Sequence, residues 1–249
     1  MSPYLSDQQI GLAQFGGAAS THPLRDAMLG MGPVGLWLLD EAAGVVGVDL
    51  SGNGNDGTYT QAAGGSFTLQ SGALPPSGQG ESTRFFNPGG VSDRAGLFVP
   101  HAAILNLVGP GTVVAWQHGT FGTWNGTMSK FNAATSNGWV ATMRDGQNFM
   151  ISTINAGSQW QLEGQINLDP TAPHLIAARW GGGNASIWAD GVKIAEILGG
   201  FGNAGATAVQ LEIGSASPVL LPCDSRQAFS GLYSRALSDS EMALLWSAS

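Results

Sequence analysis

Residues 184–198, NASIWADGVKIAEIL, predict a β-hairpin. Two runs of mostly apolar and β-branched residues lie on either side of the pair Asp190-Gly191. An Asp-Gly pair tolerates the positive φ angles of a type I′ turn, and the twist of that turn matches the twist of paired antiparallel strands. We therefore expect a strand on each side of a two-residue turn.

The same pattern extends through the chain from Val34 onward. GWVATM (138–143) and NFMISTI (148–154) flank Asp145-Gly146 and predict a second hairpin. No helix-length periodic segment lies between the strand-like runs, which argues against parallel βαβ units. We therefore predict an all-β fold, an antiparallel β-sandwich of the jelly-roll type. Further strands are expected at 112–117, 160–166, 174–180, 208–214 and 229–233.

One short helix is predicted at the C-terminal end, in LSDSEMALLW (237–246). Ser238 can cap its first turn, and Glu241 three residues later completes a capping box. Leu237 can pack against Met242 as a hydrophobic staple. The face that docks this helix on the sandwich is expected to consist of Met242, Leu245 and Trp246.

The first 32 residues differ from the rest of the chain. Short apolar patches alternate there with Gly, Pro and polar residues, and only SDQQIGLAQF and PLRDAMLGM resemble brief helices. A segment with so little core of its own gains structure by docking against a partner. We therefore predict an N-terminal arm at 1–32 and one domain at 33–249. The first residues, MSPYLSDQQIGLAQFGG, lack the basic and continuous apolar regions of a secretory signal.

Composition narrows the function classes. The 249 residues are 43% hydrophobic and only 10% charged, against about 25% charged in an average soluble domain. The net charge is −8 and no basic run occurs, so the electrostatic footprint of a nucleic-acid-binding protein is missing. No window approaches the run of about 18 apolar residues that a membrane helix needs. The single Cys223 cannot form an internal disulfide and is expected to act as a small apolar residue.

The glycine-rich stretch DLSGNGNDGTYT (49–60) is the main candidate for a ligand loop. Its glycines match the pattern G-x-G-x-x-G, but a dinucleotide site needs a helix to begin at the third glycine. The residues that follow do not predict a buried helix. Asp49, Ser51 and Asn53 occupy the first ligand positions of an EF-hand loop, but position 12 is Thr60 and not the closing Glu.

Two interpretations of this loop remain open. In the first, Asp and Asn side chains cap their own backbone and the glycines adopt left-handed conformations, so the loop is a tight turn without metal. In the second, the loop holds a hard cation, calcium, with oxygen ligands from Asp49, Ser51, Asn53 and Asp56. The turn is the favoured interpretation, and we expect no required cofactor.

Seven segments follow one another in an order that resembles the laminin-G-like jelly roll of the concanavalin A-like lectin and glucanase type. They are GLWLLDEAAGVVGVDLSGNGNDGTYT, RFFNPGG, TVVAWQHG, Ser129-Lys130, SIWADGVKIAE, LEIGSAS and FSGLYSRALSDSEMALLW. In that family an aromatic strand leads into a D-x-S-G-N-G-x-x-G turn, a later hairpin has the form Y-x-D-G, and the chain closes on an R-A-L-S-x-x-E helix. The resemblance spans about Val34 to Trp246, with Trp188 where Tyr is common. It implies two antiparallel sheets and, in some members, calcium near an edge loop.

Catalytic arrangements are missing from the sequence pattern. Glycosidases use two carboxylates about 5 to 10 Å apart, which residues i and i+2 of one strand would supply. Asp40 and Glu41 are adjacent, so in a strand they point to opposite faces, whereas the strand residues Glu163, Glu196 and Glu212 stand alone. The four histidines show no zinc spacing, and no G-x-S-x-G elbow occurs. We expect a noncatalytic protein.

Binding of sugars is compatible with the aromatic residues, because sugar rings stack on exposed aromatic faces. Trp124 and Trp160 lie in Gly-rich and polar surroundings and are the candidate glycan-binding residues. Four other tryptophans lie in strand-like segments and are expected in the core: Trp37, Trp116, Trp180 and Trp188.

We predict a noncatalytic structural protein of a bacteriophage virion that displays a lectin-like jelly roll for attachment to surfaces or glycans. Such a protein would be a capsid decoration, a head fibre or a tail adhesin. The arm would bind other virion proteins such as the capsid, and we expect a homo-oligomer located in the virion. The alternatives are an extracellular or cell-surface bacterial carbohydrate-binding module and a glycosidase of the same fold.

Overall fold

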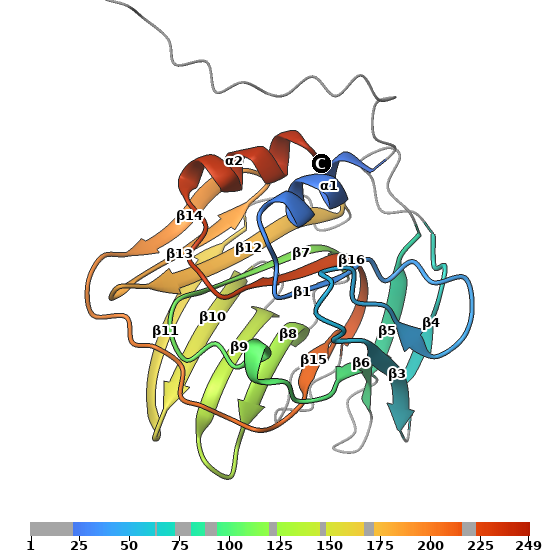
Figure 1. The fold of residues 1–249 in the computed structure, drawn as a ribbon, viewed down its shortest axis with the longest axis horizontal. Helices are drawn as coiled ribbons and strands as arrows, with labels where there is room; N and C mark the ends of the chain where they lie inside the picture. Colours follow the sequence, from blue (N-terminus) through green and yellow to red (C-terminus); the bar gives the residue numbers. More distant parts are fainter. Residues whose placement is uncertain are drawn as a thin grey trace, which may run out of the picture.

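The protein is a sandwich of two antiparallel β-sheets with helices on one outer face (Figure 1). The computed structural model describes residues 22–62, 64–72, 81–87, 94–119, 124–144, 148–166, 172–215 and 223–249. Every strand pair among these residues is antiparallel, which confirms the predicted fold class.

Within the described ranges, sheet A and sheet B contain eight strands each. Sheet A runs in the order β14 (Val192–Ile197), β13 (Asn184–Ala189), β12 (His174–Gly181), β7 (Gly111–Gly119), β16 (Cys223–Tyr233), β5 (Thr83–Asn87) and β4 (Ser66–Thr68), with β1 (Gly35–Trp37) paired to β16. Sheet B runs in the order β11 (Ser158–Gln165), β10 (Asn148–Asn155), β9 (Asn137–Arg144), β8 (Trp124–Asn132), β15 (Leu211–Ile213), β6 (Arg94–Val99), β3 (Gly57–Ala62) and β2 (Val46–Gly47). The short 3-10 helix η1 (Ala103–Leu105) lies between β6 and β7 in the chain.

Both predicted hairpins form. In the first, β13 pairs with β14, and the turn residues Asp190 and Gly191 have φ angles of 47° and 77°, as a type I′ turn requires. In the second, β9 pairs with β10, and its predicted turn at Asp145-Gly146 lies outside the described residues. The expected strand at 208–214 is shorter than predicted, because only Leu211–Ile213 pairs with its neighbours.

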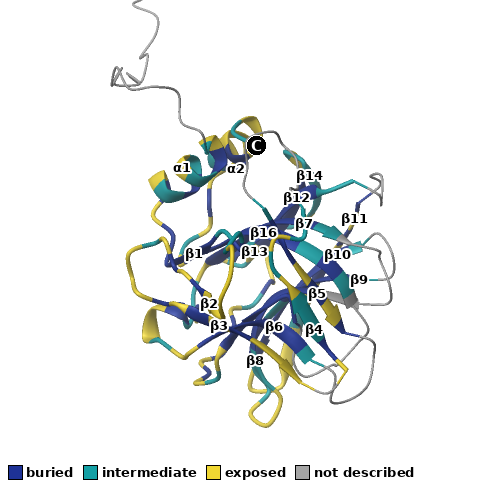
Figure 2. Ribbon diagram, turned by 90° about the vertical axis from the view of Figure 1, so that its right-hand side faces the viewer, coloured by how far each residue is buried: buried dark blue, intermediate teal, exposed yellow. Residues whose placement is uncertain are grey.

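The main core lies between the two sheets (Figure 2). Trp139 of sheet B and Trp180 of sheet A meet there, with ring centroids 5.9 Å apart. Trp37 is fully buried in the same core, and its Nε1 donates to the carbonyl oxygen of Asn55 at 3.0 Å. The sequence expectation for the strand tryptophans is confirmed, since Trp37, Trp116, Trp180 and Trp188 are all buried.

A second core fills the space between the outer face of sheet A and the helices α1 (Pro23–Gly30) and α2 (Asp239–Ser247). Leu24 and Met28 of α1 are fully buried in it, because their i, i+4 spacing places both on one helical face. Pro23–Gly30, which belongs to the predicted arm at 1–32, therefore packs on sheet A. Residues 1–21 lie outside the described residues.

The C-terminal helix forms as predicted. Ser238 and Glu241 make the reciprocal capping box, and Met242 is buried with Leu237. The guanidinium of Arg235 binds both carboxylate oxygens of Glu241, and this contact lowers the pKa of Glu241 to about 2. Arg235 also donates to the carbonyl oxygen of Met31, which ties α2 to the end of α1. Neither of the described helices is long and apolar enough to cross a membrane.

Trp246 differs from the expectation for this helix. Its side chain is 42% exposed rather than buried with Met242 and Leu245, because it lies at the edge of the second core. One face of its indole stacks on Trp116, with ring centroids 6.5 Å apart.

Candidate functional site

The glycine-rich loop at 49–56 is held together by its own side chains. The carboxylate of Asp49 accepts four hydrogen bonds: Oδ1 from the backbone N–H groups of Leu36 and Ser51, and Oδ2 from the Ser51 hydroxyl and the backbone N–H of Asn55, at 2.8 to 2.9 Å. Gly52 and Gly54 have φ angles of 83° and 69°, which are the left-handed conformations expected for a tight turn.

These contacts do not fit a calcium site. Two carboxylate oxygens offer about four lone pairs, and the four donors use those of Asp49. One carboxylate oxygen of Asp56 accepts a hydrogen bond from the backbone N–H of Asp49. The side-chain amide of Asn53 donates to Ser51 Oγ at 3.1 Å, so the hydroxyl oxygen of Ser51 is already used as an acceptor. No group of three or more His, Cys, Asp or Glu residues suited to a metal occurs within the described ranges. The geometry favours the turn.

The two candidate glycan-binding tryptophans are far apart. Trp124 is the first residue of β8. The pairing register from β8 through β9 and β10 to β11 places it level with Gln165, which is three strands away. Trp160 lies five residues from Gln165 along β11, so the two backbones are about 20 Å apart at usual strand spacings. The side chain of Trp124 lies outside the described part of the chain.

Trp160 is only partly exposed, because it packs against the main core. A Cβ placed on Gly202 would lie 2.4 Å from atoms of the Trp160 indole, so the backbone of Gly202 rests directly on the ring. Trp124 and Trp160 therefore do not form one stacking platform, and the structure leaves their individual roles as predictions.

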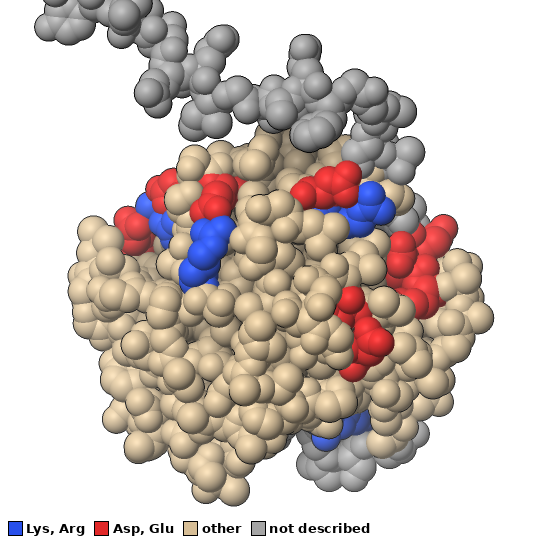
Figure 3. Space-filling view, viewed as in Figure 1, with Lys and Arg blue, Asp and Glu red and all other residues tan. Residues whose placement is uncertain are grey.

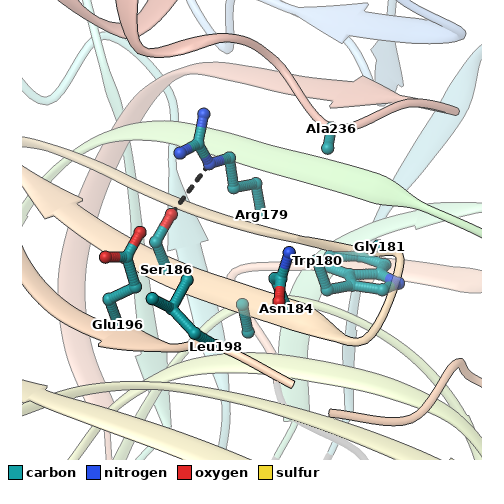
Figure 4. Close-up of a pocket in the computed structure, with 9 residues that line it drawn as sticks. Arg179, Trp180, Gly181, Asn184, Ser186, Glu196, Leu198 and Ala236 are labelled. Carbon is teal, nitrogen blue, oxygen red and sulfur yellow. Dashed lines mark hydrogen bonds between the residues drawn. The ribbon is translucent and has the colours of Figure 1, made fainter. Parts of the chain in front are cut away.

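A groove over the ends of β12, β13 and β14 is a stronger candidate for ligand binding (Figure 4). Its volume is about 160 Å³. The strand register brings its outward-facing polar side chains into one row, because Arg179 pairs with Ser186 and Ser186 pairs with Glu196. Leu198, which is 76% exposed, and Ala236 from the segment before α2 provide apolar walls.

The guanidinium of Arg179 binds groups of the protein and so stabilises the wall of the groove. Its Nε donates to Ser186 Oγ at 2.8 Å, and its two terminal nitrogens bind the carbonyl oxygen of Leu237 and the carboxylate of Asp239. These bonds hold the start of α2 against sheet A. Lys193 bridges Glu196 and Asp239, so the charges around the groove are balanced.

Three polar groups of the groove have hydrogen-bonding capacity left. Ser186 is 2% exposed, and its oxygen accepts from Arg179 and from Trp188 Nε1, so its hydroxyl hydrogen needs an acceptor elsewhere. The side-chain oxygen of Asn184 accepts from Gly199, which leaves its amide hydrogens. Glu196 uses Oε1 for Lys193, which leaves Oε2 as an acceptor. Donors and acceptors side by side next to an apolar wall suit the hydroxyl groups of a sugar.

Sequence reasoning missed this groove. Asn184, Ser186 and Glu196 lie inside the predicted hairpin, and Glu196 stands alone along its own strand. These side chains come together only across neighbouring strands. The groove could have been found from the pairing register of the hairpin, together with the rule that every second residue of a strand points outward.

Comparisons with known proteins agree with this architecture. No family model matches the sequence, and no characterised protein matches it by sequence. Solved structures do match it. The chain is similar in fold to toxin binding domains.

The binding domain of Paraclostridial Mosquitocidal Protein 1 matches with a TM-score of 0.64 at 12% identity, over 88% of this chain and 52% of that one. The binding domain of botulinum neurotoxin serotype G matches with a TM-score of 0.62 at 10% identity, over 86% and 50%. The binding domain of botulinum neurotoxin DC in complex with SialylT matches with a TM-score of 0.64 at 9% identity, over 88% and 52%. The chain therefore spans about half the length of these structures, and the likeness establishes the fold.

Lys130 is an unusual group within the fold. It lies on β8 opposite Trp139 and is fully buried. Its Nζ binds the carbonyl oxygen of Val209 and lies 3.0 Å from Nδ1 of His101. No ion pair joins Lys130 to a carboxylate in the described part of the chain. Burial therefore lowers the pKa of Lys130 to about 8.

Replacing Lys130 with methionine is expected to remove a pH dependence of stability. The unfolded chain holds the Lys130 proton up to about pH 10.5, whereas the folded chain releases it above about pH 8. Between these values the unfolded state binds more protons, so the free energy of unfolding of the wild type rises with pH, by up to about 3 kcal/mol. Urea denaturation from pH 7 to 9.5 measures this slope. A wild-type curve that is flat, or a K130M curve with the same slope, would contradict the assignment.

Proposed function

We propose that this protein is a noncatalytic glycan-binding module that uses the groove over β12, β13 and β14. The proposal rests on the row of polar groups from Ser186, Asn184 and Glu196, each with hydrogen-bonding capacity left, beside the exposed side chain of Leu198. Sugar sites combine such convergent donors and acceptors with an apolar surface. The fold supports this proposal, since binding domains share it and one of them is in complex with SialylT.

The chemistry of the groove supports binding rather than hydrolysis. A glycosidase places two carboxyl groups on either side of the scissile bond. Among the residues that line the groove, Glu196 alone carries a carboxylate, and Lys193 binds one of its oxygens at 2.7 Å. We therefore propose a noncatalytic protein. The second candidate is a secreted or cell-surface bacterial carbohydrate-binding module, and the third is a glycosidase of the same fold.

For the wider setting we propose a virion protein. Residues 1–21 would tether the jelly roll to other virion proteins such as the capsid. The low content of charged residues supports a role in an assembled particle, since fewer charges need to be desolvated at contacts. Localisation in purified particles by cryo-electron microscopy distinguishes this role from that of a cell-surface module.

Changing the polar groups of the groove is expected to weaken glycan binding at least tenfold. The double variant N184A/E196Q removes an amide donor and replaces the charged carboxylate acceptor with a neutral amide, and each lost or weakened hydrogen bond to the ligand costs about 1 kcal/mol or more. Both residues are exposed, so the fold should persist. A glycan array identifies ligands of the wild type, and calorimetry measures their affinity for the variant.

The matched control is E163Q, an exposed carboxylate of β11 on sheet B that also carries an ion pair, with Arg144. It should bind glycans as the wild type does. Equal binding by wild type and N184A/E196Q would contradict the groove as the site, and a wild type that binds no glycan would contradict the function.

A further inference from the structure

A ridge of apolar side chains lies at the β2 edge of sheet B, whereas the groove lies on sheet A. Val46, Val48 and Leu50 are 49%, 46% and 37% exposed, whereas Gly47 and Asp49 between them are buried. Monomeric proteins rarely gather apolar side chains on the surface without a use for them.

The buried positions explain why the ridge faces outward. A Cβ on Gly47 would lie 2.6 Å from the side chain of Leu97, so only glycine fits on the inner side there. Asp49 must point inward to accept its hydrogen bonds from Leu36 and Asn55. Alternation along an extended chain then directs Val46, Val48 and Leu50 away from the core.

A crease continues the ridge across the outer face of sheet B. Val46 pairs with Thr58, and Thr58 pairs with Phe98, which lines a cavity of about 220 Å³. Arg94 lies over the Phe98 ring at 4.5 Å and is paired with the buried Glu212. Among the described residues both helices pack on sheet A, so neither covers this face (Figure 2). The other residues that line the cavity are Thr60, Ala62 and Gln210.

Carboxylates flank the ridge. Glu41 accepts a hydrogen bond from the backbone N–H of Val48, and Asp56 accepts one from the backbone N–H of Asp49. Burial, and then the charge of Glu41, raise the pKa of the neighbouring Asp40. Glu41 and Asp56 form no ion pair with another described residue, whereas the charges of His22 and Arg25 act on Asp40. Acidic side chains also gather at the right of the face in Figure 3.

We propose that this ridge docks an extended segment of a partner protein, in which apolar side chains alternate and Lys or Arg residues flank them. The apolar side chains would cover Val46, Val48 and the crease, and the basic residues would pair with Glu41 and Asp56. Charge complementarity of this kind sets which partner binds. This docking surface is separate from the proposed glycan groove and does not depend on it.

The charges of the chain argue against two other occupants of this surface, a second copy of the protein and residues 1–21. A second copy would bring the same carboxylates against Glu41 and Asp56, and the chain as a whole has a net charge of −8. Residues 1–21 contain one Asp and no Lys or Arg, so they lack the basic flanks.

Two fluorescent peptides test the proposal on the full-length protein. Both have the same length and the same alternation of Val and Thr, but one carries two Lys residues at each end and the other carries two Glu residues. Fluorescence anisotropy at low ionic strength is expected to show at least tenfold tighter binding of the Lys peptide. The difference should shrink at 0.5 M salt, where the Debye length falls to a few ångströms. The variant V46S/V48S should lose binding of the Lys peptide.

The matched control is V192S/L244S, which changes two side chains of similar exposure, 62% and 51%, on sheet A and on α2. It should bind the Lys peptide as the wild type does, and circular dichroism should show both variants folded. The proposal is overturned if the Lys peptide does not bind, if both peptides bind equally, or if V46S/V48S binds like the wild type. Ultracentrifugation showing a dimer that V46S/V48S dissociates would also overturn it, in favour of a second copy.

Discussion

Replacing Asp49 with alanine is expected to lower the free energy of unfolding by about 3–5 kcal/mol. The side chain is 7% exposed and accepts four hydrogen bonds, two of them from the backbone of the loop and one from Leu36 of β1. Alanine would leave buried N–H groups without acceptors, and each such group costs about 1–3 kcal/mol. Thermal and urea denaturation measure the loss.

Two controls separate the turn from a cation site. D56A removes a single hydrogen bond from an exposed carboxylate and should cost only about 1 kcal/mol. Calcium or a chelator should leave the melting temperature of the wild type unchanged, because the oxygens of Asp49 are already occupied by donors. A calcium-dependent rise in melting temperature, or a D49A variant as stable as the wild type, would contradict this account of the loop.

Removing residues 1–32 is expected to cost about 5 kcal/mol or more, whereas removing residues 1–21 should leave stability unchanged. The longer deletion takes away α1, whose Leu24 and Met28 are fully buried, and truncating buried side chains of this size costs about 2–5 kcal/mol each. It also removes Met28 and Met31, whose carbonyl oxygens accept from Tyr233 and Arg235. Such a loss is a large part of a typical domain's stability of about 5–15 kcal/mol.

Denaturation of the two truncated proteins measures the effect, and the variant L24A/M28A in the full chain provides the matched comparison. The shorter deletion also tests the proposed tether, because it should leave a folded module that no longer enters particles. Equal stability of both truncated proteins would show that α1 contributes nothing to the body. Particles that still incorporate the protein without residues 1–21 would refute the tether.

Features set by neighbours in the chain could be predicted from sequence. The turn at Asp190-Gly191 and the capping box of Ser238 and Glu241 depend on residues one to three positions apart, so their chemistry is visible in the sequence. The self-capping of the loop by Asp49 was predicted for the same reason.

Features set by distant segments could not be predicted in this way. The groove exists because the register aligns Arg179, Ser186 and Glu196, and three separate strands carry them. Trp160 was a candidate for stacking, but Gly202, which is 42 positions away, covers part of its ring. The docking of α1 depends on a space on sheet A that only the assembled sheet provides. The laminin-G-like family assignment and the virion role also stay predictions.

Chemical-shift mapping by NMR would locate the glycan on the surface of the protein. The 15N-labelled protein would be titrated with the neutral glycan that binds best on the array. Saturable shifts are expected at the groove, in the amides of Arg179–Ser186, Glu196–Gly199 and Ala236, and none on sheet B. Shifts centred on sheet B, or around Trp124 alone, would contradict the groove as the binding site.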